Sequence, residues 1–308
     1  MKKLLIAMLL LMPVMVASVG CEKEPPQAPP VWGPQPPSGG DGDEEDQPSR
    51  PTEPAACTNI VVAHRGGSTE AGSRLNPDNS LASLRYAMQL GCYASECDIY
   101  WTKDNKVVVA HADGNCCING VHPWEYTLDE IRLRGFLTNG EQIPELEDFI
   151  DAVMVEGNCT RLWLDIKNIT SPSTLTQYPI NAAKRACEII KEKHAEKFCE
   201  FICTGNTTVM ASSFGYAATA GINIGWMSNS AASTYAGRGY NWANLSVDYV
   251  EGGSTSGSRT IKEFKDNRIA LSVFNVDSDA DVEFYTSHAS DLKAICTNYP
   301  NKLINKMK

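Results

Sequence analysis

Short apolar runs rich in β-branched residues alternate with helix-length segments along most of this chain, and this alternation restricts its possible folds more than any other feature. A strand, a helix and a second strand in that order form the βαβ unit of a parallel sheet. The part of the chain after residue 55 is about 250 residues long, the usual size of one barrel of such units. The sequence therefore predicts an α/β fold, a (β/α)8 TIM barrel, over residues 56–308.

More segments qualify as strands than the eight that such a barrel needs, so at least one of them lies outside it. The candidate strands are residues 61–67, 95–100, 106–111, 161–167, 200–203, 209–214, 222–227, 245–250, 269–276 and 294–297. Helices are predicted near residues 81–90, 180–193 and 260–267 from their apolar spacing. Asn79 or Ser80 can cap the first helix, and Thr127 with Glu130 forms a capping box that begins another.

Residues 1–20 have the pattern of a secretion signal: two lysines, an apolar segment too short to span a bilayer, and a small-residue run that ends before Cys21. This pattern resembles a bacterial lipobox, in which Cys21 is lipidated and becomes the first residue of the mature chain. We therefore expect an exported bacterial lipoprotein, anchored to the membrane through Cys21 on the periplasmic face or at the cell surface. The alternative is ordinary signal cleavage, which leaves Cys21 as a thiol.

Residues 21–55 are rich in proline and carry an acidic run at residues 41–46. Such a segment cannot bury enough apolar surface to offset the entropy lost on ordering, so it is predicted to be a disordered tether. The chain has a formal net charge of −10 at pH 7 and no basic stripe. Nucleic acid is therefore not an expected partner.

The chain after the signal contains an even number of cysteines besides Cys21, which in an exported protein suggests disulfides whose connectivity stays open. They are Cys57, Cys92, Cys97, Cys116, Cys117, Cys159, Cys187, Cys199, Cys203 and Cys296. A zinc site at Cys116 and Cys117 with His111 or His122 is the competing interpretation. Adjacent cysteines are poor partners for one tetrahedral ion, so disulfides are favoured.

Polar residues gather where the first candidate strands end. His64 closes one apolar strand and His111 closes another, in a chain with only five histidines. Glu96 and Asp98 are two apart in the strand between them, which places both carboxylates on one face. The apolar residues beside them, at positions 97 and 99, are expected to face the packed side. The carboxylates then face water or the barrel interior, where they require a cation.

The strand at residues 161–167 repeats the pattern, because Asp165 and Lys167 are also two apart at its end. Active sites of this barrel lie at the carboxyl ends of the strands, so these groups are expected to converge there. Phe274, near the end of a later strand, lines the pocket or simply packs in the core.

The ordered set of motifs resembles the glycerophosphodiester phosphodiesterases over nearly the whole chain after the tether. The matching motifs are His64-Arg65-Gly66, Pro77-Asp78-Asn79-Ser80, Glu96-x-Asp98, Thr102-Lys103-Asp104-Asn105, Val108-Val109-x-His111, Ile143-Pro144-x-Leu146-Glu147, Asp165-x-Lys167, Ser212-Ser213-Phe214, Val273-Phe274-Asn275-Val276 and Ile295-Cys296-Thr297-Asn298-x-Pro300. The chain departs from the family at four positions. It has aspartate at Asp78 and Asp165 instead of glutamate, Ala112 instead of aspartate, and Phe274 instead of tryptophan.

The resemblance implies hydrolysis of a small-molecule glycerophosphodiester to glycerol 3-phosphate and an alcohol. It implies that His64 and His111 are the acid/base pair, and that one divalent cation, Ca²⁺ or Mg²⁺, is held by three carboxylates. Attack by the substrate's own hydroxyl, which gives a cyclic phosphate, and direct attack by water both remain open. The implied ligands of the cation are Glu96, Asp98 and Asp165, and the implied groups around the substrate and its phosphate are Arg65, Lys167, Asp78 and Phe274.

Two further interpretations belong to other classes. With an aspartate at position 165, the chain also resembles the sphingomyelinase D and phospholipase D-type enzymes, which act on lysolipids or related phosphodiesters. Those enzymes lack an element like residues 77–80. A non-catalytic binding protein on the same barrel is favoured by Ala112 and by the two shortened carboxylates. The intact histidines, Arg65 and Lys167 argue against it. The head group and the oligomeric state stay open.

Overall fold

The computed structural model describes residues 50–70, 73–169 and 173–308. The predicted signal peptide, Cys21 and most of the tether lie outside the described residues. Residues 50–55, which were assigned to the tether, lie against the barrel domain. Arg50 pairs with Asp151 at 2.8 Å, and the amide of Ala55 donates to the carbonyl of Asn158 at 2.8 Å. The ordered domain therefore includes the last six residues of the predicted tether.

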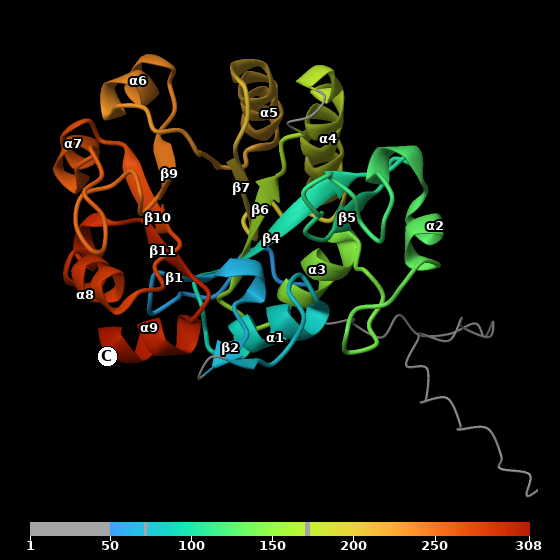
Figure 1. The fold of residues 1–308 in the computed structure, drawn as a ribbon, viewed down its shortest axis with the longest axis horizontal. Helices are drawn as coiled ribbons and strands as arrows, with labels where there is room; N and C mark the ends of the chain where they lie inside the picture. Colours follow the sequence, from blue (N-terminus) through green and yellow to red (C-terminus); the bar gives the residue numbers. More distant parts are fainter. Residues whose placement is uncertain (1–49, 71–72, 170–172) are drawn as a thin grey trace, which may run out of the picture. The chain divides into compact units, whose positions relative to one another are not determined.

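Eight parallel strands close into a barrel, which confirms the (β/α)8 prediction (Figure 1). Each strand pairs with the next, and the last pairs with the first, so the barrel has no free edge. The strands are β1 (Val61–Ala63), β4 (Ala94–Trp101), β6 (Arg161–Ile166), β7 (Cys199–Cys203), β8 (Ile224–Trp226), β9 (Trp242–Ser246), β10 (Ala270–Phe274) and β11 (Ala294–Thr297). A short ribbon of β2 (Thr69–Glu70) and β3 (Ser73–Arg74) follows β1.

Helices follow the strands and cover the outside of the barrel (Figure 1). Ser80, one of the two predicted caps, accepts a hydrogen bond from the amide of Ser83, and the predicted Thr127–Glu130 capping box is present. In the described part of the chain, no helix is both long and apolar enough to cross a bilayer. The helices are α1 (Leu81–Gln89), α2 (Leu128–Arg132), α3 (Leu146–Val153), α4 (Gln177–Glu192), α5 (Thr207–Ala220), α6 (Ala232–Gly237), α7 (Ile261–Asp266), α8 (Asp279–Ser287) and α9 (Pro300–Met307).

Two of the predicted strands are not barrel strands. The segment at residues 106–111 forms β5 (Val107–Val109), which pairs antiparallel with the outer end of β4. The segment at residues 209–214 lies inside helix α5, and its prediction as a strand was wrong. Asn206 caps this helix by accepting from the amide of Val209, and its buried residues recur at helical spacing as far as Ala220.

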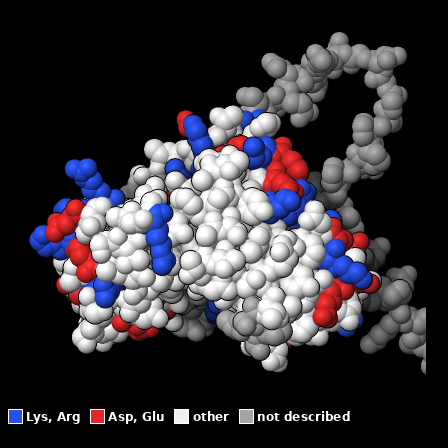
Figure 2. Space-filling view, turned by 90° about the horizontal axis from the view of Figure 1, so that it is seen from above, with Lys and Arg blue, Asp and Glu red and all other residues white. Residues whose placement is uncertain are grey.

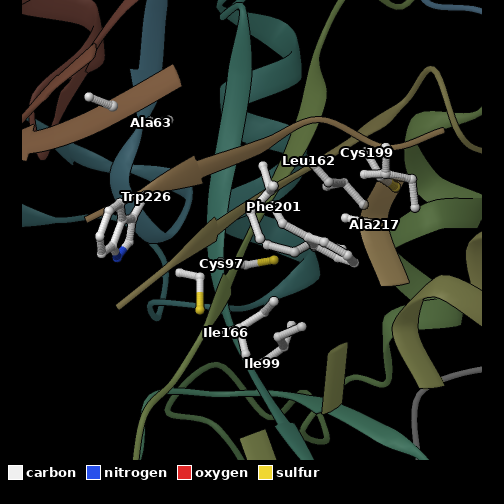
Figure 3. Close-up of a cluster of buried hydrophobic side chains, with 14 of the residues drawn as sticks. Ala63, Cys97, Ile99, Leu162, Ile166, Cys199, Phe201, Ala217 and Trp226 are labelled. Atoms are coloured by element: carbon white, nitrogen blue, oxygen red, sulfur yellow. The ribbon is translucent and has the colours of Figure 1, made fainter. Parts of the chain in front are cut away.

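Side chains alternate along β4 as predicted. Cys97 and Ile99 face the helices and lie in the main core beside Phe201 of β7 and Ile166 of β6 (Figure 3). Their neighbours at positions 96 and 98 therefore face the barrel interior.

Two tryptophans fill the amino-terminal part of the barrel interior. The rings of Trp163 and Trp242 lie 4.9 Å apart, and both are almost completely buried. The Trp163 indole nitrogen donates to the buried carboxylate of Glu200 at 2.8 Å, and Lys293 pairs with the same carboxylate at 2.9 Å. This end of the barrel is packed and satisfied, which leaves the carboxyl ends of the strands for a site.

The surface seen in Figure 2 carries blue and red side chains side by side at its margins and is largely uncharged in the middle. Residues 204–237, which form α5, β8 and α6, contain no charged side chain. No continuous basic stripe appears on this face, in agreement with the acidic net charge.

Candidate active site

Three buried carboxylates meet at the carboxyl ends of β4 and β6. The parallel register places Asp98 directly opposite Asp165, and Glu96 lies one residue pair deeper on the same face. Their exposed fractions are 2% for Glu96, 0% for Asp98 and 3% for Asp165. Each offers an oxygen within 4.8 Å of the others. The convergence predicted from the spacing of these residues is therefore present in the structure.

Two cations pair with this acidic cluster. The Lys167 ammonium lies 2.6 Å from Asp98 Oδ1 and also contacts Asp165. The Arg65 guanidinium Nε lies 3.2 Å from Asp98 Oδ2, while the backbone amide of Arg65 donates to Glu96 at 2.9 Å. Arg65 reaches this position because the chain turns sharply after β1, with φ of 52° at Arg65. Both predicted phosphate-binding residues thus border the carboxylates.

The environment shifts the carboxyl groups in opposite directions. Burial and the charge of Asp98 raise the pKa of Glu96 well above its ordinary value, and burial also raises the pKa of Asp165. Burial opposes ionisation of Asp98 too, but Lys167 and Arg65 outweigh it and lower the pKa of Asp98. The charges of Asp165 and Asp98 raise the pKa of Lys167 despite burial, so it stays protonated. The cluster is short of positive charge.

This donor set fits a divalent cation. With all three carboxyl groups ionised, Arg65 and Lys167 would supply two positive charges against three negative ones, and a divalent cation would supply the missing positive charge. Asp165 Oδ1 is buried and has no hydrogen-bond partner, a costly arrangement that a cation ligand would relieve. Hard carboxylate oxygens are the ligands that Ca²⁺ and Mg²⁺ prefer. Asp165 is one methylene shorter than the glutamate usual in the resembled family, but its oxygen still lies within 4.8 Å of those of Glu96 and Asp98.

His64 is held in one orientation by an amide and a carboxylate. Its Nδ1 lies 2.8 Å from Asn298 Oδ1, and the Asn298 amide nitrogen donates to Asp277 at 2.6 Å. Because the ionised carboxylate only accepts, the Asn298 oxygen must face the imidazole and accept from Nδ1–H. The other ring nitrogen, Nε2, is then free to take a proton, and it lies 3.9 Å from Glu96. Burial lowers the pKa of His64, which favours the neutral ring.

His111 reaches the site by a different route from the one predicted. Strand β4 extends past the barrel rim, and β5 runs back beside it, so the amide of Ala110 donates to the carbonyl of Asp98 at 3.0 Å. The next residue, His111, is exposed and lines a cavity of about 390 Å³ with Asp78 and Asn79. Partial burial lowers the pKa of His111, and the charge of Asp98 opposes this shift. The hairpin, rather than a barrel strand, thus brings His111 toward the carboxylates.

The segment at residues 77–80 supports the cluster. Asp78 lies 3.7 Å from Arg65 and also pairs with Arg74, as expected for a residue that orients the arginine. Asn79 donates to Asp98 Oδ2 at 2.8 Å and accepts from the backbone amide of Asp98 at 3.0 Å. It does so with φ of 58°, a left-handed conformation that asparagine tolerates well. Asn79 was predicted only as a possible helix cap.

The cavity beside the carboxylates has a volume of about 200 Å³. The predicted pocket residue Phe274 lines it from the end of β10, opposite groups from β1, β4 and β6. Its walls are His64, Arg65, Glu96, Asp165, Lys167, Ile202, Met227, Asn244, Phe274, Asn275 and Cys296. Except for Asp98, Asp78 and His111, the predicted site residues of the described chain therefore share one cavity, and Asp78 and His111 line the neighbouring one.

Replacing Asn298 by alanine is expected to lower kcat and to move the acidic limb of kcat/KM to lower pH. Burial lowers the pKa of His64, and the hydrogen bond that His64 donates to Asn298 opposes this shift, so removal of the bond lowers the pKa further. A base is active when unprotonated, and a lower pKa keeps it so at lower pH. A pH profile from 4 to 9 measures both effects. Asn301→Ala, in α9, is the control, and an unmoved limb in Asn298→Ala would contradict the orienting role.

The cysteine contacts leave the predicted disulfides as a prediction. The Sγ atoms of Cys57 and Cys159 approach to 3.1 Å. Cys117 Sγ lies 3.6 Å from His122 Nδ1 in the loop after β5. Within the described residues, the only group of three or more metal-ligating side chains that could hold an ion is the carboxylate triad. The zinc interpretation of Cys116 and Cys117 therefore gains no support.

The chain is a closed β/α barrel with acidic, basic and imidazole groups at the carboxyl ends of its strands, the place where barrels of this class carry their active sites. A family model described as "Glycerophosphoryl diester phosphodiesterase family" matches residues 64–302. The chain belongs to this family.

Individual relatives agree with this assignment. A curated glycerophosphodiester phosphodiesterase from Caldanaerobacter subterraneus subsp. tengcongensis is 32% identical over 102 residues, which is 30% of this chain and only 40% of that relative's length. A crystal structure of a glycerophosphodiester phosphodiesterase from Parabacteroides distasonis has a TM-score of 0.64 at 21% identity, covering 82% of this chain and 98% of that one. An Oleispira antarctica phosphodiesterase in complex with the product sn-glycerol-3-phosphate has a TM-score of 0.59 at 19% identity, covering 80% and 96%. The structural likenesses establish the fold.

Proposed function

We propose that the protein hydrolyses a glycerophosphodiester to glycerol 3-phosphate and an alcohol. The observation that carries this proposal is the buried cluster of three carboxylates, which Arg65 and Lys167 contact and whose members Glu96 and Asp165 share a cavity with His64. A phosphodiester is an anion with a poor alkoxide leaving group, so its hydrolysis requires charge neutralisation, a base and an acid. The site supplies candidates for each.

Glu96, Asp98 and Asp165 would hold one Ca²⁺ or Mg²⁺. When bound, such an ion neutralises negative charge that develops on the phosphoryl oxygens. Arg65 and Lys167 border the same carboxylates and can bind the remaining phosphate oxygens, Arg65 with its planar fork and Lys167 as a point charge. Their ion pairs with Asp98 keep both side chains directed into the site before substrate arrives.

We assign the base to His64 and the acid to His111. His64 is half-buried and fixed by Asn298 with Nε2 free, and burial lowers its pKa, so it can take the proton from the attacking hydroxyl group. His111 lines the adjoining cavity and is exposed, so it can exchange its proton with water and donate it to the departing alcohol oxygen. Asp78 holds Arg65, and Phe274 forms an apolar wall for the substrate.

Product analysis tests this proposal against the lysolipid alternative. The purified enzyme is incubated with glycerophosphodiesters that carry ethanolamine, choline or glycerol, and separately with lysophospholipids. Glycerol 3-phosphate is then measured with its dehydrogenase, and all phosphorus products are identified by ³¹P NMR. Release of glycerol 3-phosphate from the glycerophosphodiesters is expected. Turnover of lysophospholipids alone would overturn the proposal, and no turnover of either class would favour a binding protein.

We further propose that the protein is an exported lipoprotein anchored through Cys21. Residues 1–20 support this with their basic start, short apolar segment and small residues before Cys21. Cys21→Ala is expected to move the protein out of the membrane fraction of the producing cells, or to block its processing. Mass spectra of the protein show whether Cys21 carries an acyl chain. Membrane association that persists in Cys21→Ala, in protein without the acyl chain, would contradict the anchor.

A further inference from the structure

Two cysteines from distant parts of the chain meet at the amino-terminal end of the barrel. Cys57 precedes β1 and Cys159 precedes β6, and their sulfur atoms lie 3.1 Å apart although 102 residues separate them. We propose that Cys57 and Cys159 form a disulfide in the exported protein. A bond between them would be a covalent link across the base of β4, which lies between β1 and β6 in the barrel.

The contact singles out this pair among the ten cysteines. Both thiols are only partly buried, and besides each other they approach only backbone carbonyls, such as that of Gly91 at 3.3 and 3.6 Å. Cys92 is nearby, but it is fully buried, and its contact with the Cys159 sulfur is made by its carbonyl oxygen, at 3.8 Å. Within the described part of the chain, the acidic triad is the group of three or more potential metal ligands, and neither cysteine belongs to it.

The chemistry is an ordinary thiol–disulfide exchange. The two thiols lose two protons and two electrons as the sulfur–sulfur bond forms, and a disulfide oxidant, such as a dithiol oxidase of the envelope or glutathione disulfide, is reduced to two thiols. Burial and the contact with Cys57 raise the pKa of Cys159 to about 12, so few thiolates exist once the domain has folded. We therefore expect the bond to form during folding rather than afterwards.

The position of the bond gives it a specific consequence. The bond would join the segments that precede β1 and β6, with β4 between them. These three strands carry site residues: His64 follows β1, Glu96 lies within β4 and Asp165 lies near the end of β6. It also fixes the chain immediately after residues 50–55, where the domain joins the tether. Closing a loop of about 100 residues stabilises a fold by restricting the unfolded chain. The bond should thus raise thermal stability without taking part in the reaction.

Peptide mapping tests the bond directly. The exported protein is purified without reductant, and its free thiols are blocked with iodoacetamide. Its peptides are then identified by mass spectrometry. A peptide pair joined through Cys57 and Cys159 is expected, and it should separate after reduction. Refolding the cytoplasmically produced chain with glutathione disulfide gives the same pair if the geometry alone selects it. This arm does not depend on export or on the proposed activity. Alkylation of both cysteines, or a bond from either one to Cys92, would overturn the proposal.

Thermal unfolding with matched variants tests the consequence. Cys57→Ser, Cys159→Ser and the double variant are each expected to lower Tm by the same amount, about 5–15 °C. Dithiothreitol should lower the Tm of the parent protein to that of the variants and leave the variants unchanged. Cys116→Ser, in the loop after β5, is the control and should keep the response to dithiothreitol. Additive losses in the double variant, or a parent protein insensitive to reductant, would contradict a disulfide.

Discussion

Replacing His64 by glutamine is expected to lower kcat by about 10²–10⁴-fold, the usual contribution of a general base. Glutamine cannot take a proton near neutral pH, whereas the neutral imidazole can. The substitution is close in size, and an amide can still meet Asn298, so the barrel should keep its stability. Steady-state kinetics on a glycerophosphodiester, with thermal unfolding of the same sample, measures both properties.

The matched control is His194→Asn, because His194 is exposed, lies after α4 and has the left-handed backbone that asparagine accepts. It should keep full activity. A His64→Gln enzyme that retains more than about a tenth of the parent kcat would argue against a base at this position.

His111→Gln separates the acid from the base. The departing alkoxide of a natural substrate requires a proton, but a nitrophenolate leaving group requires almost none. We therefore expect His111→Gln to lose much of its kcat on a glycerophosphodiester and far less on a nitrophenyl phosphodiester. His64→Gln should lose activity on both substrates to a similar extent. Equal losses of His111→Gln on the two substrates would contradict its assignment as the proton donor.

The sequence predicted those parts of the site that follow from strand periodicity. Glu96 and Asp98 are two residues apart on one strand, and Asp165 and Lys167 repeat that spacing on another, so each pair had to share a face. The parallel register seen in the structure then places Asp98 opposite Asp165, a pairing that the strand spacing alone does not give. His64 could be predicted for a different reason, because it follows directly after the first apolar strand.

The supporting residues could not be predicted in this way. Asn298 contacts His64 across 234 positions of sequence, and its role depends on which way Asp277 turns its amide. Asn79 looked like a helix cap because asparagine before a helix usually is one, but Ser80 takes that role and leaves Asn79 for Asp98. Short-range patterns do not record such tertiary hydrogen bonds.

Short apolar runs did not determine the structure at two places, because a run of this composition can form a barrel strand, a strand outside the barrel or part of a helix. Residues 209–214 begin with a buried valine and methionine, which suits a strand, but the capped helix α5 continues past them to Ala220. Strand β5 is apolar because helix α3 and the rest of the hairpin cover it, although it is not part of the closed barrel. The ladder partners, rather than the apolar run, decide whether a strand belongs to the barrel.

Chelation of divalent cations is expected to reduce activity by at least about 100-fold, and added Mg²⁺ or Ca²⁺ should restore it. A second readout does not depend on activity. A ligand present at about 100 times its Kd stabilises the folded state by about 2.7 kcal/mol, which corresponds to a rise in Tm of about 5–10 °C for a domain of this size. The parent protein should show this rise with the activating ion. A protein that keeps its activity and its Tm in excess chelator would contradict the cation site.

The difference in Tm between Asp165→Asn and the parent protein should depend on the cation. The variant should be at least as stable as the parent in chelator and less stable than the parent when the cation is present. Burial raises the pKa of Asp165 above its unfolded value, so without a cation the ionised carboxylate destabilises the fold as pH rises through the folded pKa. The amide removes that charge, so the variant should match or exceed the parent Tm at pH 8 in chelator. With cation the parent gains stability, whereas the variant gains little and stays inactive.

Asp266→Asn, exposed in α7, is the control and should follow the parent in both conditions. An Asp165→Asn protein that gains as much Tm from the ion as the parent would show that this oxygen is not a ligand.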